Sequence, residues 1–125
     1  MVVKLNHTIV AARDARVTAD FLSEVLGFAP AEPFGPFLSI HTDNEVTLDV
    51  LTTTDDIAPQ HYAFLVSEEE FDVIFARVRA TGGRYWADPF HQHPDEINHA
   101  DGGRGVYFED PSGHNLEIIT RPYGG

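Results

Sequence analysis

The second half of the chain opens with the stretch QHYAFLVSEEEFDVIFARVRATGG, residues 60–83. Its first seven residues predict a strand, because strand-forming apolar residues gather there. Ser67 and Glu70 are spaced as in a capping box, which predicts that a helix begins at this point. The glycine pair at 82–83 ends that helix, and its apolar stripe is formed by Phe71, Ile74, Phe75 and Val78.

The first half of the chain has the same order of elements. A strand is predicted over about residues 3–11, followed by a helix from about Asp14 to Leu26 that ends at Gly27. The stretch APAEPFGP, residues 29–36, is rich in proline and predicts a turn region. The helix is expected to bury an apolar stripe formed by Val17, Phe21, Leu22 and Val25.

Each half ends in further strands. The first half has FLSIHT and EVTLDVL, joined by a turn at Asp43 and Asn44. The second half has a short strand near Tyr85, a long loop, and then GVYFED and NLEII, joined by a turn at 111–113. Both halves therefore follow the order strand, helix, then two or three strands, which predicts an internal duplication of a βαβββ unit.

A duplicated βαβββ unit predicts an α+β fold. Two paired modules would form a curved, mostly antiparallel sheet with the helices on its outer face. The 125 residues are predicted to form a single domain. Module one would span about residues 1–56 and module two about residues 57–125.

Composition limits the classes of partner. The chain has 8 lysine and arginine residues against 20 aspartate and glutamate residues, a formal net charge of −12 at pH 7. Neither nucleic acid nor an anionic membrane is expected as a partner, whereas a metal ion or a cationic small molecule would be favoured. No apolar run reaches the ~18–20 residues of a membrane span, and no signal peptide pattern occurs. The chain has no cysteine, which fits a reducing compartment, and we expect a cytoplasmic protein.

Four polar side chains occupy matching positions in the two halves. His7 and His61 each follow an amide residue near the start of a first strand, and Asp49 and Glu117 each follow a leucine within a last strand. Because strand residues alternate between faces, all four can project into the concave interior of the sheet. Two imidazoles and one carboxylate suit Fe(II), Mn(II), Ni(II) or Zn(II) and leave coordination positions open for a substrate. Hydrogen-bonded core histidines and solvent-facing carboxylates are the alternative.

The stretch INHADGGRGVYFEDPSGHNLEII, residues 97–119, carries a more specific pattern. It is similar to the signature of extradiol dioxygenases, in which I/V-x-H is followed after a gap by Tyr, D-P-x-G and Glu. Together with LNHTIV, LGF and HYAFLV earlier in the chain, this stretch resembles the vicinal oxygen chelate superfamily. That superfamily includes glyoxalase I, extradiol ring-cleaving dioxygenases, fosfomycin-resistance transferases and bleomycin-resistance proteins.

The resemblance implies roles for individual residues. His7, His61 and Glu117 match the metal ligands, and Fe(II) is the favoured metal. Tyr107 matches a tyrosine that hydrogen-bonds a substrate oxygen, and His99 matches a histidine behind the ligands that holds or moves a proton. Asp49 stands where glyoxalase I has a glutamate as fourth ligand, although aspartate is one methylene shorter.

The resemblance favours a metal-dependent enzyme of the extradiol dioxygenase type, in which a small substrate such as a catechol-like diol binds beside O2. Two alternatives stay open. One is a glyoxalase-type isomerase or lyase using Ni(II) or Zn(II), with Asp49 as a ligand, and the other is a non-catalytic binder of a small molecule such as a drug. Relatives with one pair of modules are typically dimers, so a homodimer is expected. His91 and His93 receive no role, and His114 is expected to be exposed beside its turn.

Overall fold

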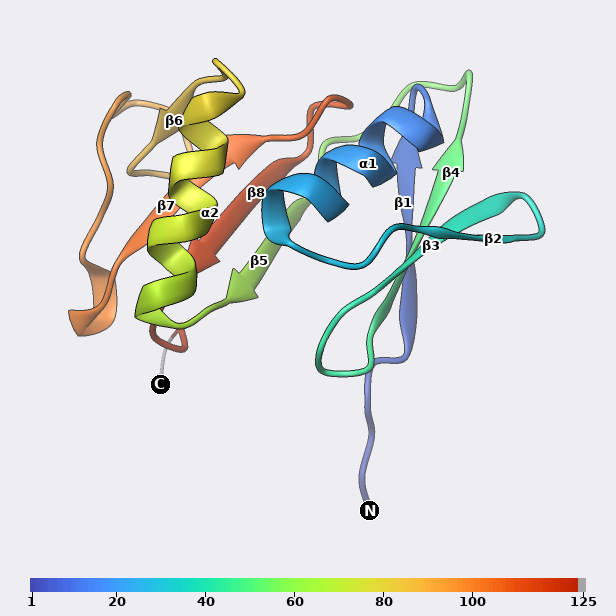
Figure 1. The fold of residues 1–125 in the computed structure, drawn as a ribbon, viewed down its shortest axis with the longest axis horizontal. Coiled ribbons are helices and arrows are strands. Elements are labelled where there is room, and N and C mark those ends of the chain that lie inside the picture. Colours follow the sequence, from blue (N-terminus) through green and yellow to red (C-terminus); the bar gives the residue numbers. More distant parts are fainter. Residues whose placement is uncertain (124–125) are drawn as a thin grey trace. The chain divides into compact units, whose positions relative to one another are not determined.

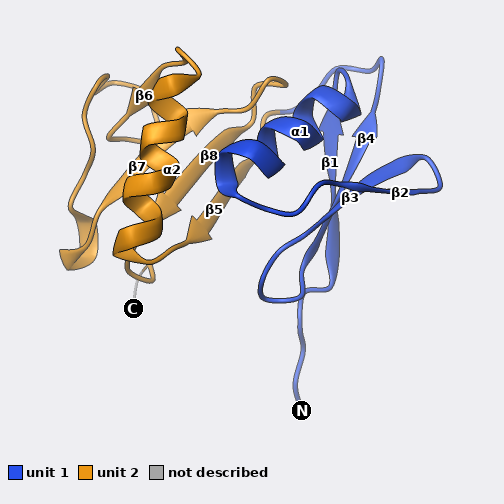
Figure 2. Cartoon of the chain, viewed as in Figure 1, with its two compact units in different colours: residues 1–58 blue, residues 59–125 orange. Residues whose placement is uncertain are grey.

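The computed structural model describes residues 1–123. The chain divides into two units, Met1–Ala58 and Pro59–Gly125 (Figure 2). Each unit contains an α-helix and a four-stranded sheet, and the elements follow one another in the same order (Figure 1). Among the described residues, no helix has both the length and the apolar character that a membrane crossing requires. The cytoplasmic location stays a prediction.

Unit one folds as a βαβββ module. Its elements are β1 (His7–Ala12), α1 (Ala15–Leu26), β2 (Glu32–Phe34), β3 (Phe37–His41) and β4 (Thr47–Thr52). The sheet has the order β1-β4-β3-β2, with β1 parallel to β4 and the other neighbours antiparallel. Helix α1 packs against β1, β3 and β4. The strands contribute a buried apolar core formed by Val10, Ala12, Ile40, Leu48 and Val50.

Helix α1 begins and ends at the predicted signals but buries a different stripe. The Asp14 carboxylate accepts the backbone N–H groups of Arg16 and Val17, and Gly27 ends the helix with a φ of 82°. The prediction that Val17 is buried is wrong, because this residue is 51% exposed. The buried face is richer in small side chains, which let the helix approach the sheet closely, and is formed by Ala15, Thr18, Ala19, Leu22 and Val25.

The turn region predicted at residues 29–36 contains a strand that the sequence pattern does not predict. Strand β2 pairs with β3 so that Phe34 lies opposite Phe37 across a tight turn. Gly35 in this turn has a φ of 57°, a conformation that glycine adopts without a Cβ clash. Pro33 lies inside β2, where a missing backbone N–H is tolerated because β2 is an edge strand. The prolines therefore mark a short edge strand here rather than a break.

Unit two repeats the module. Its elements are β5 (His61–Leu65), α2 (Glu68–Ala80), β6 (Tyr85–Trp86), β7 (Gly105–Glu109) and β8 (Asn115–Ile119), with a 3-10 helix at Ala100–Gly102. The sheet has the order β5-β8-β7-β6, with β5 parallel to β8 and the other neighbours antiparallel. Ser67 and Glu70 form the predicted capping box of α2. The predicted fold class is confirmed: the chain is α+β, with two βαβββ modules whose strand pairs are mostly antiparallel.

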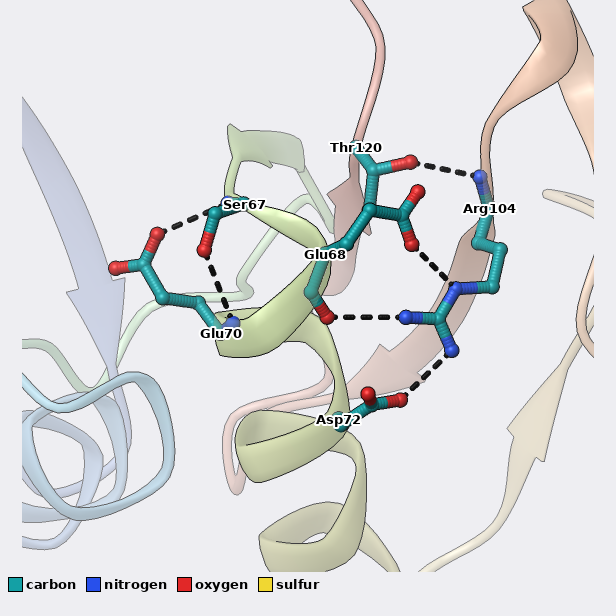
Figure 3. A network of polar contacts seen from close by, with 6 residues as sticks. All are labelled: Ser67, Glu68, Glu70, Asp72, Arg104 and Thr120. Carbon is teal, nitrogen blue, oxygen red and sulfur yellow. Dashed lines mark hydrogen bonds and ion pairs between the residues drawn. The ribbon is translucent and has the colours of Figure 1, made fainter.

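Helix α2 is tied to the sheet of unit two by Arg104, which directly precedes β7 (Figure 3). Arg104 donates from Nε to Glu68 Oε2 and from Nη1 to Asp72 Oδ1, both at 2.7 Å. Its guanidinium lies 4.3 Å from the ring centroid of the buried Phe71. Hydrogen bonds to Thr120 and Arg104 lower the pKa of Glu68. The first turn of α2 is therefore fixed beside β7 through both ion pairs and a cation–π contact.

Candidate active site

The strand register puts the candidate ligands at equivalent positions in the two units. In unit one, Asp49 is paired with the residue two positions after His7. In unit two, Glu117 is paired with the residue two positions after His61. Residues two positions apart on a strand share a face, as do paired residues on neighbouring strands. Each histidine therefore lies on the same face of its sheet as the carboxylate of its own unit.

In unit two, His61 and Glu117 are in direct contact. His61 Nε2 lies 3.0 Å from Glu117 Oε1. A carboxylate accepts hydrogen bonds, so the His61 tautomer with its N–H at Nε2 would donate a hydrogen bond to Glu117. The His61 side chain is 47% exposed and that of Glu117 is 12% exposed. An imidazole nitrogen and a carboxylate oxygen thus meet at a partly exposed position, and this donor set fits a divalent transition metal.

Tyr107 contacts both members of this pair. It lies opposite Glu117 across β7 and β8, it is 9% exposed, and its ring centroid is 5.6 Å from that of His61. Its phenol hydrogen-bonds the Glu117 carboxylate. Burial, this hydrogen bond and the charge of Glu117 raise the pKa of Tyr107 well above its ordinary value. The phenol is therefore protonated at neutral pH and acts as a donor.

In unit one, the histidine and the carboxylate have different partners. Asp49 is 7% exposed, and its Oδ1 accepts a hydrogen bond from Ser39 Oγ at 2.7 Å. Ser39 occupies the register position that Tyr107 has in unit two. His7 is exposed, and its Nδ1 lies 2.8 Å from the side-chain oxygen of Asn6. A hydroxyl group on the neighbouring strand thus holds the carboxylate in each unit, but only unit two joins its carboxylate to its histidine.

Within residues 1–58, and likewise within residues 59–123, the structure shows no group of three or more His, Asp and Glu side chains that could hold a metal ion. In unit two, His61 and Glu117 are the predicted ligands that meet. The prediction that His7, His61 and Glu117 bind one metal stays a prediction.

Three further histidines of unit two, His91, His93 and His99, lie in the loop between β6 and β7. His99 is exposed and directly precedes the 3-10 helix. His91 stacks on Trp86, with 3.6 Å between the ring centroids and 3° between the planes. His91 Nε2 also lies 3.0 Å from Asn115 Oδ1. This histidine therefore fixes its loop to β6 and β8, a structural role that the sequence pattern does not reveal.

The placement predicted for His114 is wrong. This residue is 1% exposed, and its Nδ1 accepts a hydrogen bond from the Gln60 backbone N–H at 3.0 Å. The expectation of exposure rested on the polar turn beside it. The correct signal lies in the alternation along β8, because His114, Leu116 and Ile118 all project to the buried face.

Comparison with known proteins gives the family. A family model for the Glyoxalase/Bleomycin resistance protein/Dioxygenase superfamily matches residues 4–118. The glutathione transferase FosA of Serratia marcescens is 31% identical over a match that covers 94% of this chain and 81% of the relative.

Solved structures agree with this result. The oxidases ChaP-H1 and ChaP-H2 each superpose with a TM-score of 0.97, at 56% and 59% sequence identity. These matches cover 99% and 100% of this chain and 100% and 98% of the oxidases. The fosfomycin resistance protein FosX of Mesorhizobium loti shares the fold, with a TM-score of 0.72 at 18% sequence identity. This match covers 98% of this chain and 96% of FosX. The chain therefore belongs to the Glyoxalase/Bleomycin resistance protein/Dioxygenase superfamily, as its resemblance to the vicinal oxygen chelate proteins predicts.

Proposed function

We propose that the protein is a metal-dependent oxidase or oxygenase that acts on a small substrate with two neighbouring oxygens, such as a catechol-like diol. The observation that carries the proposal is the 3.0 Å contact between His61 Nε2 and Glu117 Oε1, with Tyr107 hydrogen-bonded to the same carboxylate. Identities of 56% and 59% to two proteins named as oxidases favour redox chemistry over isomerisation.

The proposed metal ligands are His7, His61 and Glu117. Fe(II) is the favoured metal, and Mn(II), Ni(II) and Zn(II) suit the same donor types. When bound, the metal would act as a Lewis acid that holds both substrate oxygens through its open coordination positions. Histidine and carboxylate side chains bind metals in their deprotonated forms, so acid should weaken metal binding.

Tyr107 and His99 are the residues that we propose to hold or move protons. Tyr107 keeps its proton because its pKa is raised, so its phenol would donate a hydrogen bond to a substrate oxygen in place of its hydrogen bond to Glu117. His99 lies in the exposed loop before β7, where its imidazole can exchange protons with solvent. The two residues would thus have different roles, with Tyr107 as a hydrogen-bond donor and His99 as the group that moves a proton.

The protonation of Tyr107 can be followed directly. We expect the ¹³Cζ NMR signal of Tyr107 to stay unchanged past about pH 10, where an ordinary tyrosine is half ionised. In Glu117→Gln the signal should titrate at lower pH than in the wild type, because the negative charge that raises the pKa is gone. Tyr107→Phe assigns the signal. Titration of Tyr107 at or below pH ~10 in the wild type would contradict this prediction.

Asp49 separates the oxygenase from the glyoxalase-type alternative, in which it would be a fourth ligand. Because Ser39 already holds its carboxylate, we expect Asp49→Ala to weaken Co(II) binding by less than about tenfold. Glu117→Ala should weaken binding by more than about 100-fold, since it removes a ligand rather than a supporting group. Equal losses in the two variants, measured by calorimetry, would favour the glyoxalase-type site.

Metal analysis and oxygen uptake together test the proposed function. Protein purified without chelators or a histidine tag is analysed for metal and then loaded anaerobically with Fe(II) or Zn(II). Oxygen uptake with catechol-like diols is expected for the Fe(II) form, and neither the Zn(II) form nor Glu117→Ala should show it. Full activity with Zn(II) would overturn the redox assignment. Tight binding of small cations by protein without metal would favour the drug-binding alternative.

A second candidate function is the transfer of glutathione to a small electrophile. The identity of 31% to the glutathione transferase FosA favours it. Loss of free glutathione thiol in the presence of fosfomycin and Mn(II)-loaded protein, measured under argon, would support this function. Glu117→Ala serves again as the control. Thiol loss without any oxygen uptake in the preceding assay would replace the first proposal by the second.

We also expect a homodimer. Strands β1 and β5 lie at the edges of their sheets and carry exposed apolar side chains, with Ile9 51% and Leu65 60% exposed. Exposed apolar edge strands favour association between chains. A second copy related by a two-fold axis gives a closed dimer, in which the edge strands are covered. Light scattering at micromolar concentration should give about twice the chain mass of 13.9 kDa. In a dimer, the His7 ligand can come from the partner chain, so a monomer with full metal occupancy would exclude such sharing.

A further inference from the structure

We propose that His114 is a positioning residue for the metal site. Its buried imidazole holds the start of β5, where His61 lies, in register with Glu117 on β8. The inference rests on the proposed role of His61 and Glu117 as ligands. It assigns a function to His114, which directly follows the D-P-x-G turn, beside the ligand role proposed for Glu117.

The hydrogen bond defines the state of the imidazole. His114 Nδ1 lies 3.0 Å from the Gln60 backbone nitrogen. Because a backbone N–H can only donate, Nδ1 accepts this hydrogen bond through its lone pair and carries no proton. The neutral ring therefore has its N–H at Nε2. The side chain is 1% exposed, so water does not compete for this acceptor. The ring of Tyr62 packs edge-on against it, at 5.6 Å between centroids. The imidazole therefore contacts the residues on both sides of His61.

The imidazole is itself held from the β7–β8 turn. Asp110 Oδ1 accepts the backbone N–H groups of Ser112 at 3.0 Å and His114 at 2.8 Å. The Asp110 N–H donates to the His114 carbonyl at 3.1 Å. Gly113 takes a φ of 89°, which closes the turn. Asp110 is 6% exposed, so this set of bonds is shielded from water and gives His114 a fixed base.

His114 and its neighbour in β8 hold Gln60 at two points. The Gln60 N–H donates to His114 Nδ1, and the Gln60 carbonyl accepts the Asn115 N–H at 2.8 Å. His61 follows Gln60 directly, and Glu117 stands two residues beyond Asn115. Because β5 is an edge strand of its sheet, β8 is the neighbour that fixes its position. The two bonds to Gln60 therefore continue the pairing of β5 with β8, which runs from His61–Asn115 to Leu65–Ile119, at the end of β5 where His61 contacts Glu117.

Three variants separate the hydrogen bond from the packing. His114→Asn keeps an acceptor near the position of Nδ1, His114→Gln moves the acceptor farther out, and His114→Leu fills the space without an acceptor. Metal-free protein is examined by NMR for exchange of the Gln60 amide and for the nuclear Overhauser effect between the rings of His61 and Tyr107. Co(II) affinity is measured separately by titration, and far-UV circular dichroism reports on folding.

In His114→Leu we expect Gln60 exchange to be about fivefold to tenfold faster, as for the loss of one hydrogen bond. The ring contact should weaken, and Co(II) affinity should fall about tenfold or more, as for other residues that orient ligands. His114→Asn should resemble the wild type in all three measurements. If His114→Leu fails to fold, His114→Gln replaces it and should show the same losses relative to His114→Asn.

Two results would overturn the positioning role. One is an unchanged ring contact and Co(II) affinity in folded His114→Leu or His114→Gln. The other is an equal loss in His114→Asn and His114→Leu, which would mean that the ring shape matters and the acceptor does not. If wild-type protein does not bind Co(II), the proposed function fails, whereas the NMR measurements on metal-free protein still decide the role of His114.

Discussion

The His61→Ala variant is expected to lose more than about 100-fold in affinity for a divalent metal. The reason is that it removes one of the two proposed ligands that meet in unit two, whereas losing a group that only orients a ligand costs about 10- to 100-fold. Folding should be little affected, because the His61 side chain is 47% exposed and a surface change of this kind costs within about 1 kcal/mol. Calorimetric titration with Co(II) and urea unfolding measure the two effects.

His93→Ala is the matched control for this variant. It removes a histidine of the same unit whose side chain is 63% exposed and lies 3.9 Å from the Glu96 carboxylate. Its Co(II) affinity should equal that of the wild type. Full metal occupancy in a His7→Ala/His61→Ala double variant would show that the metal is bound elsewhere.

The parts of the fold that the sequence predicts rest on local signals at the helix ends and on the duplication of the βαβββ unit. The capping box of Ser67 and Glu70 and the glycine after α1 are local signals with a fixed geometric meaning, and both are confirmed. The duplication adds a constraint that local propensity lacks. The first and last strands of each unit pair in the same register, and this places Asp49 and Glu117 at equivalent positions.

The errors arise where packing overrides local pattern. Val17 is apolar at helical spacing, yet the smaller Ala15 and Thr18 are buried, since close approach of the helix to the sheet favours small side chains. Strand β2 contains a proline and follows another, and only its place at the sheet edge makes it compatible with pairing. His114 is polar beside a turn, and its burial depends on the Gln60 amide, which lies far away in the sequence. The alternation with Leu116 and Ile118 indicates the buried face of His114, but not its hydrogen-bond partner.

The candidate site divides in the same way. That His61 and Glu117 share a face of the sheet follows from the register of two neighbouring strands, so the matching halves are enough to predict it. Their contact is not predicted in this way, because His7 and Asp49 at the equivalent positions have other partners. The role of His7 as a metal ligand stays a prediction, because its approach to His61 and Glu117 would depend on association between modules or chains. No spacing along one strand encodes such association. The role of His99 also stays a prediction, since an exposed loop side chain can take several directions.

Phe71→Ala is expected to lower the free energy of unfolding by about 3–5 kcal/mol, a large part of the total for a domain of this size. Phe71 is fully buried, and its ring lies 5.8 Å from that of Phe75 and 4.3 Å from the Arg104 guanidinium. The change leaves a cavity and removes the surface on which Arg104 stacks. Val73→Ala, at a 50% exposed position of the same helix, is the control and should cost less than about 1 kcal/mol.

The same variant links the stability of unit two to its proposed metal site. Because a metal that binds the folded chain stabilises it by mass action, Co(II) at about 100 times its Kd should restore about 2.7 kcal/mol to Phe71→Ala. The double variant Phe71→Ala/His61→Ala should recover almost none of this, since one of the proposed ligands that meet in unit two is missing. Urea unfolding with and without Co(II) measures both quantities. Equal recovery in the two variants would mean that the stabilising metal binds away from His61.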